Sequence, residues 1–272
     1  MRITAQRNRL LALDAKPYSI DWRFLPDSML VGKDFVRQHF VALSDAVALY
    51  PSTQPLWCKT IGQRTLNSLN AAQMLFVHVP RTGGTSISLH LYGRNLPHFS
   101  MRYYRSVFGE RLSAIPTFAI ARDPVERFIS GYNFVRAGGT RLMASDRFSA
   151  LKLRHLRSLE DYVDYFSAFP ERRAEILPFA EQVSFVLDED DRIAVDRFFA
   201  MNVRLGFAEA LYDWLQTPDL PHLNMTVGRQ PIIGNTLRSR IEHLYRRDAV
   251  LYREVMARGG TAEMAGRALS QL

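Results

Sequence analysis

The stretch MLFVHVPRTGGTSISLHLY, residues 74–92, carries the clearest signal for the fold. It begins with an apolar run of strand length, which stops at a proline and then at the glycine pair 83–84. Ile87 and Leu91 follow four residues apart, a spacing typical of one face of a helix that begins near Thr85. The segment therefore predicts a buried strand, a tight glycine loop and a helix, in that order.

A second unit of the same kind occurs in TFAIARDPVERFISGY, which starts at residue 117. The run TFAIA at 117–121 predicts a short buried strand. Asp123, Pro124 and Glu126 then occupy the positions of an N-cap, a first-turn proline and a capping-box acid. The apolar residues that give this helix a buried face are Val125, Phe128, Ile129 and Tyr132. Strands that alternate with helices predict a mostly parallel sheet with helices on both sides.

The later part of the chain has mainly helical patterns. Ser158 and Asp161 form a capping pattern at the start of one helix. The expected elements are helices over 158–169, 208–215 and 238–257 and a strand within AVDRFFAM at 194–201. We interpret the acidic run DEDD at 188–191 as a solvated loop.

The N-terminal part of the chain has a different character. Apolar residues at helical spacing over 34–50 are followed by the turn-rich PSTQP at 51–55. We expect residues 1–70 to form an accessory helical segment and residues 71–272 to form the main domain. No internal repeat or low-complexity linker separates the two.

Composition and charge limit the classes of protein. With 47% hydrophobic and 23% charged residues, the 272-residue chain does not fit a disordered, collagen-like or coiled-coil protein. Its 35 Lys and Arg against 27 Asp and Glu give a net charge of +8, which favours an anionic partner. The single cysteine, Cys58, excludes an internal disulfide and a cysteine zinc cluster. Without a signal-peptide core or a membrane-spanning apolar run, we expect a cytoplasmic protein and leave peripheral contact with a membrane open.

The sequence PRTGGTS has the features of an anion cradle. Glycines let backbone N–H groups turn toward a ligand, and the helix N-terminus adds partial positive charge. Arg81, Thr82, Thr85 and Ser86 supply further donors, so we expect phosphate or sulfate to bind there. The alternative is a tight turn in which Thr85 is only an N-cap. The nucleoside-triphosphatase pattern G-x-x-x-x-G-K-[ST] does not fit, because no Lys precedes Thr85.

Arg122 and Ser130 of the second unit predict a second anion site. Arg122 follows its strand at the carboxyl edge, where ligands bind in open parallel sheets. Ser130 lies two helical turns further along the chain. Each has an ordinary alternative role, as a surface or capping arginine and as a small packing residue.

These residues resemble sulfotransferases that use 3′-phosphoadenosine 5′-phosphosulfate (PAPS). LFVHVPRTGGTSI is similar to their 5′-phosphosulfate loop, and FAIARDPVERFISGY to their 3′-phosphate segment. The similarity is greatest to the carbohydrate group that includes heparan sulfate 2-O- and 6-O-sulfotransferases and bacterial relatives. LGFAEALYDWL, PHLNMT and IEHLYRRDAVLY resemble that group's C-terminal helices and the loop between them, so the resemblance covers about residues 74–257.

The resemblance implies a P-loop-like three-layer α/β fold, in which a central mostly parallel sheet is flanked by helices, with residues 71–272 as the sulfotransferase domain. It also implies the donor-binding residues: Arg81, Thr82, Gly83, Gly84, Thr85 and Ser86 for the 5′-phosphosulfate, Arg122 and Ser130 for the 3′-phosphate, and Asn224 and Thr226 for the nucleotide. A polar turn is an equally good explanation of Asn224. Most relatives have Lys where Arg81 stands, and Arg is a poor proton donor, so Arg81 would stabilise the departing oxygen electrostatically.

A histidine is the expected base for the acceptor hydroxyl. His78 lies within the apolar strand and is expected to be a packed core residue, and His90 is expected to be exposed on the helix. His98, in LPHFSMR between the two motifs, resembles the His-x-Ser of the 2-O-sulfating relatives and is our candidate, with a structural histidine as the alternative. Ser100 and Arg102 are candidate contacts to the acceptor or to the transferring group.

The leading hypothesis is transfer of a sulfuryl group from PAPS to a hydroxyl of a carbohydrate or glycolipid acceptor, with adenosine 3′,5′-bisphosphate as the product. We expect no metal, because cationic side chains and backbone amides suffice for a sulfuryl group. Two alternatives stay open. A P-loop small-molecule kinase would need magnesium, and a basic nucleic-acid-binding module would account for the charge, although the chain has no recognised DNA or RNA motif.

Overall fold

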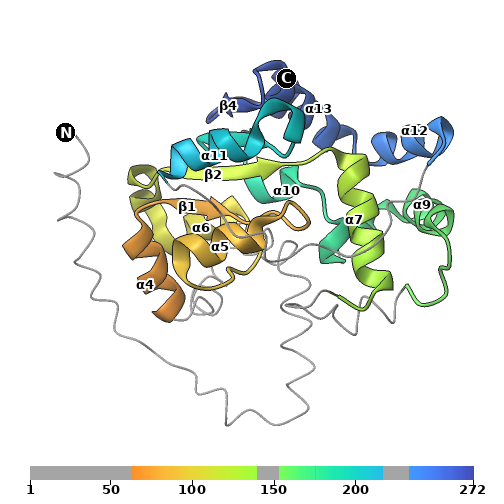
Figure 1. Cartoon of the computed structure of the whole chain (residues 1–272), viewed down its shortest axis with the longest axis horizontal. Helices are drawn as coiled ribbons and strands as arrows, with labels where there is room; N and C mark the ends of the chain where they lie inside the picture. The colour runs from red at the N-terminus through yellow and green to blue at the C-terminus, as the bar shows by residue number, and fades with distance from the viewer. Residues whose placement is uncertain (1–62, 140–152, 175, 217–232) are drawn as a thin grey trace, which may run out of the picture.

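The structure is a computed structural model that describes residues 63–139, 153–174, 176–216 and 233–272 (Figure 1). The helix expected over 34–50 lies outside these ranges and stays a prediction. The division after residue 70 also stays a prediction, and it falls within helix α4, Gln63–Ala72.

The strands form one sheet of four in the order β1-β2-β3-β4: β1 (Leu75–Val77), β2 (Thr117–Ala121), β3 (Arg197–Ala200) and β4 (Thr261–Glu263). β1 and β3 both pair in parallel with β2, whereas β4 pairs antiparallel with β3. Every residue of β1 and β2 is buried, as expected for strands covered on both faces. The expected α/β class with a mostly parallel sheet is confirmed.

Helices lie on both sides of the sheet, which is compatible with a three-layer arrangement. The α-helices are α4, α5 (Gly84–Tyr92), α6 (Met101–Phe108), α7 (Pro124–Arg136), α9 (Leu159–Ala168), α10 (Val183–Val186), α11 (Phe207–Leu215), α12 (Asn235–Leu244) and α13 (Arg246–Ala257). Short 3₁₀ turns cover Gly109–Ala114, Pro170–Arg173, Leu177–Phe179, Val203–Leu205 and Leu269–Gln271. Figure 1 shows α4, α5 and α6 below the strands and α11 and α13 above them, and both upper helices contact β3.

Two groups of buried apolar side chains stabilise the fold. The larger group surrounds the sheet, where Phe118 of β2 packs against Trp214 of α11 with ring centroids 4.7 Å apart. The second group joins α7, α9 and α12, and Phe128 contributes the expected buried face of α7. The capping box of Ser158 and Asp161 is formed as predicted. Among the described residues, no helix has the length and apolar character needed to span a bilayer.

Two local predictions need correction. The single helix expected over 238–257 is broken into α12 and α13 at Tyr245, which has a non-helical φ of −114° and ψ of 36°. Tyr245 is completely buried, and its hydroxyl donates to the carbonyl of Phe179 at 2.7 Å, so tertiary packing dictates the break. The acidic loop at 188–191 is not wholly solvated. Asp188 is buried, and its carboxylate accepts from the N–H groups of Asp190 and Arg192.

Candidate functional site

The glycine loop connects the end of β1 to the start of α5 at the carboxyl edge of the sheet. Its backbone turns through left-handed conformations at Arg81 (φ 65°) and at Gly83 (φ 75°). Thr82 is buried, and its hydroxyl donates to the carbonyl of Val79 at 2.9 Å, which closes the turn. Gly83, not Thr85, is the N-cap of α5, and it offers no side chain to the first-turn N–H groups. The loop therefore presents a helix N-terminus, with its partial positive charge, at the sheet edge.

Gly84 is required by packing beneath the loop. A Cβ atom at this position would lie 2.3 Å from Cδ2 of His78 and 2.7 Å from Cε1 of Phe76. Real Cβ atoms do not approach other atoms so closely. The imidazole of His78 thus fills the space under the first turn of α5, and only glycine fits above it.

The structure brings the two predicted anion-binding motifs together. Nε and Nη2 of Arg81 donate to Oγ of Ser130 at 3.2 and 3.0 Å, so the glycine loop contacts α7 directly. The Arg81 guanidinium also lies 4.6 Å from the ring centroid of Phe134. Nη1 of Arg122 donates to the carbonyl of Arg81 at 3.0 Å. Arg122 and Ser130, which follow Arg81 by 41 and 49 positions in the sequence, therefore contact Arg81 at one edge of the sheet.

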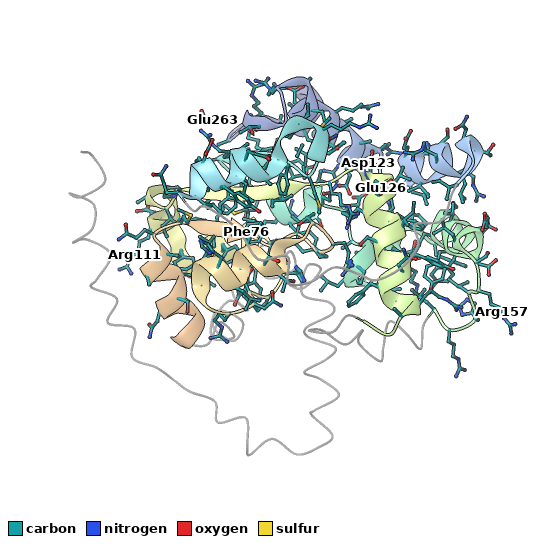
Figure 2. All side chains as sticks on the ribbon, in the orientation of Figure 1. Phe76, Arg111, Asp123, Glu126, Arg157 and Glu263 are labelled. Atoms are coloured by element: carbon teal, nitrogen blue, oxygen red, sulfur yellow. The ribbon has the colours of Figure 1, made fainter. Side chains whose placement is uncertain are left out.

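This edge concentrates positive charge. Burial, together with the nearby cations of Arg122 and Arg127, lowers the pKa of Arg81 to about 10. Burial also lowers the pKa of Arg122, while the carboxylate of Glu126, in the first turn of α7 (Figure 2), acts in the opposite direction. Both guanidinium groups stay protonated at neutral pH. Their mutual repulsion would be relieved by an anion bound between them.

His98 lies just before α6, close to the glycine loop, and is partly buried. Its Nδ1 is 2.6 Å from the carbonyl oxygen of His78, which can only accept, so the proton sits on Nδ1 and the Nε2 lone pair is left as an acceptor. His78 donates from its own Nδ1 to the carbonyl of Leu96 at 3.0 Å, and the two imidazole rings are 4.1 Å apart. Burial lowers the pKa of His98 to about 4, and the Arg81 cation contributes to the shift.

The positions expected for His78 and His90 are both confirmed. His78 is buried, hydrogen-bonded and stacked on Phe76, which confirms its core position. Burial, and secondarily the neighbouring His98, holds its pKa well below the ordinary value. His90 is exposed on α5, as predicted.

Ser100 and Arg102, the candidate contacts to the acceptor, both form hydrogen bonds within the fold. Ser100 is buried and caps α6, with its hydroxyl accepting from the N–H of Tyr103 at 3.2 Å. Nε and Nη2 of Arg102 donate to the carbonyl of Asp188 at 3.0 and 2.8 Å. Their roles toward an acceptor stay predictions. Asn224 and Thr226 lie outside the described residues.

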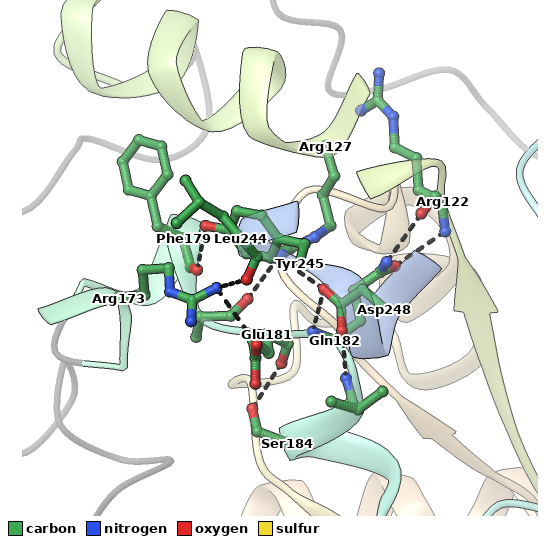
Figure 3. A network of polar contacts seen from close by, with 12 residues as sticks. Arg122, Arg127, Arg173, Phe179, Glu181, Gln182, Ser184, Leu244, Tyr245 and Asp248 are labelled. Atoms are coloured by element: carbon green, nitrogen blue, oxygen red, sulfur yellow. Dashed lines mark hydrogen bonds and ion pairs between the residues drawn. The ribbon is translucent and has the colours of Figure 1, made fainter. Parts of the chain in front are cut away.

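The sequence patterns missed a polar network behind Arg122 (Figure 3). The side-chain amide of Gln182 contacts the backbone of Arg122, and the backbone of Gln182 contacts the buried carboxylate of Asp248 on α13. Arg127 of α7 pairs with the same carboxylate at 3.3 Å. Neither periodicity nor a motif distinguishes Gln182, because its role depends on contact with a segment 60 residues away.

An open groove of about 750 Å³ lies near this site but is distinct from it. Residues of α12 and α13 line it, together with Asp123 and Pro124 at the start of α7. Side chains of both charge signs, such as Arg253 and Asp191, border it, and neither Arg81 nor His98 does. The groove therefore does not coincide with the anion cradle. In the ranges that the structure describes, no group of three or more His, Cys, Asp or Glu is arranged to hold a metal ion.

No protein-family model, curated protein or solved structure matches the chain.

Proposed function

We propose that the chain is a PAPS-dependent sulfotransferase that acts on a hydroxyl of a carbohydrate or glycoconjugate, on a P-loop-like three-layer fold. The observation that carries the proposal is the convergence of Arg81, Arg122 and Ser130 at the N-terminus of α5, with His98 beside them. Sequence resemblance motivates the choice of donor, and this geometry supports it.

The chemistry of the donor set fits a nucleotide with anionic groups at both ends. The glycine loop supplies a helix N-terminus, whose partial positive charge suits the 5′-phosphosulfate. Arg122 and Ser130 stand on the second strand–helix unit and suit the 3′-phosphate. The bound donor would supply the sulfuryl group and a stable leaving group. Because Arg81 bonds to Ser130, one guanidinium links the two subsites.

Arg81 would stabilise negative charge on the departing oxygen without giving up a proton. Its pKa of about 10 keeps the guanidinium charged at neutral pH. The left-handed backbone at Arg81 and the bond from Arg122 to its carbonyl fix the start of its side chain. Such a fixed cation in a partly buried site stabilises developing charge more than a cation in water does.

His98 would accept the proton of the acceptor hydroxyl at Nε2. The bond from its Nδ1 to the His78 carbonyl fixes the required tautomer. With a pKa of about 4 the imidazole is neutral at pH 7 and ready to accept, but it is a weak base. Anionic groups held by the adjacent loop would raise the pKa of the imidazole toward neutrality. Ser100 and Arg102 keep their proposed proximity to the acceptor, because they open the helix that follows His98.

Isothermal titration with adenosine 3′,5′-bisphosphate tests the donor site. Replacing Arg122 with Ala removes a charge-assisted contact, so we expect binding to weaken roughly 10- to 100-fold. Arg258→Ala is the matched control, because Arg258 forms an exposed pair with Glu254 on α13. Absence of binding by the unaltered chain would overturn the proposal, and magnesium-dependent ATP turnover would favour a kinase instead.

A transfer assay with labelled PAPS and a panel of saccharides tests the base. His98→Ala should abolish transfer and leave the affinity for adenosine 3′,5′-bisphosphate within a few-fold of the original. His90→Ala, which removes an exposed imidazole from α5, should leave transfer unchanged. Equal loss of transfer and of nucleotide binding in His98→Ala would make His98 a structural residue.

A further inference from the structure

We infer that Gln182 is a positioning residue for Arg122, and that it sets the preference of the site for a nucleotide that carries a 3′-phosphate. The inference rests on the proposed function and assigns a role to a residue outside both motifs. Gln182 is buried, and it lies directly before α10.

The amide of Gln182 holds the peptide backbone of Arg122 on both sides of the residue. Its Oε1 accepts from the N–H of Arg122 at 2.9 Å, and its Nε2 donates to the Arg122 carbonyl at 2.8 Å. A side-chain amide thus imitates the pair of bonds that a neighbouring strand would make just beyond the end of β2. The two bonds also fix the orientation of the amide, because each of its polar atoms has a partner of the opposite kind.

Gln182 is itself anchored by a buried carboxylate. Its N–H donates to Oδ2 of Asp248 at 2.9 Å, and the N–H of Val183 donates to Oδ1 at 3.0 Å. Asp248 has no exposed surface, and Arg127 pairs with it at 3.3 Å. Figure 3 shows the resulting connection, in which Gln182 bridges Asp248 on α13 and Arg122 at the end of β2.

The connection continues to the glycine loop. Nη1 of Arg122 donates to the carbonyl of Arg81, and the Arg81 side chain donates to Ser130. The Arg127 cation repels the Arg122 guanidinium, whereas the carboxylates of Glu126 and Asp123 attract it, but among the described residues no ion pair holds it in place. Its position therefore depends on its backbone, which Gln182 holds. Without this support, the Arg122 guanidinium would keep its charge but lose its fixed direction.

Gln182→Leu removes both bonds at nearly constant volume, and Gln182→Glu keeps the acceptor for the Arg122 N–H but loses the donor to its carbonyl. Titration compares adenosine 3′,5′-bisphosphate with adenosine 5′-phosphate, which lacks the 3′-phosphate. We expect Gln182→Leu to weaken binding of the bisphosphate about tenfold or more and binding of the monophosphate much less. Gln182→Glu should fall between Gln182→Leu and the original chain.

Thr117→Val is the matched control for loss of a buried side-chain bond. Thr117 stands at the opposite end of β2, and its hydroxyl donates to Oδ2 of Asp196 at 2.8 Å. Urea unfolding of all variants measures the general loss of stability. We expect Thr117→Val to lose stability but to keep the ratio of the two nucleotide affinities.

A double-mutant cycle with Arg122→Ala separates positioning from a general structural effect. If Gln182 acts through Arg122, Gln182→Leu should change bisphosphate affinity less than twofold in the Arg122→Ala background. Additive losses, or an unchanged affinity ratio in Gln182→Leu and Gln182→Glu, would overturn the inference while the proposed function stands. Failure of the unaltered chain to bind either nucleotide would instead overturn the proposed function and this inference with it.

Discussion

Replacing Gly84 with Ala tests whether the glycine loop rests on His78 as the structure describes. The added Cβ would lie 2.3 Å from His78 Cδ2, whereas ordinary contact begins near 3.4 Å, so the imidazole must move by about 1.1 Å. His78 resists this movement, because it is buried, bonded to Leu96 and stacked on Phe76. Overpacking of this kind costs about 1–3 kcal/mol. From the middle of this range, about 2 kcal/mol, alanine would return at most about 1 kcal/mol through its higher helix propensity, so we expect a net loss of about 1–2 kcal/mol.

Urea unfolding followed by circular dichroism measures this loss as a shift of the midpoint at constant slope. Gly234→Ala is the control, because a Cβ at Gly234, the N-cap of α12, would have no atom of the described residues within 4 Å. Its effect should be about 0.5–1 kcal/mol, because alanine is a poorer N-cap than glycine. If Gly84→Ala is as stable as the original chain or more stable, the close packing of His78 against α5 is refuted.

Two further predictions concern buried ionisable groups. Between its ordinary pKa of 6.5 and its folded value of about 4, His98 binds fewer protons in the folded state than in the unfolded state. The free energy of unfolding should therefore fall by up to about 3 kcal/mol as the pH decreases through this window. Urea midpoints measured against pH should show a smaller decrease in His98→Ala than in the original chain. Asp248→Ala should cost about 3–5 kcal/mol, because it leaves Arg127 charged and buried without its partner, whereas Glu254→Ala, at an exposed pair, should cost less than about 1 kcal/mol in the same assay.

The sequence was informative wherever a local signal agreed with the final packing. The apolar runs before the glycine pair and before Asp123 became β1 and β2, because both runs are buried and end at turn residues. Asp123 caps α7 as predicted, accepting from the N–H groups of Val125 and Glu126. Local pattern and tertiary burial lead to the same element at these positions.

The sequence was uninformative where distant contacts decide. No glycine or proline marks the helix break at Tyr245 in the sequence. The break follows from a hydrogen bond to the carbonyl of Phe179, 66 residues earlier. The same holds for Gln182, whose amide pairs with a backbone 60 residues away. The adjacency of Arg81 and Ser130 could be anticipated only as a consequence of parallel strands ending at one edge.

The distribution of arginines explains why net charge was a weak guide to the site. Surface arginines such as Arg105 and Arg247 pair with acidic residues, and exposed pairs of this kind contribute little energy. Arg122 is different, because its Nη1 donates to a neutral carbonyl and burial lowers its pKa, with the Arg127 cation acting in the same direction. Holding Arg122 next to Arg81 costs stability. The hydrogen bonds of Gln182 to Arg122 and to the buried carboxylate of Asp248 offset this cost. A cationic pair supported in this way is expected at a site selected for anion binding, where function opposes stability.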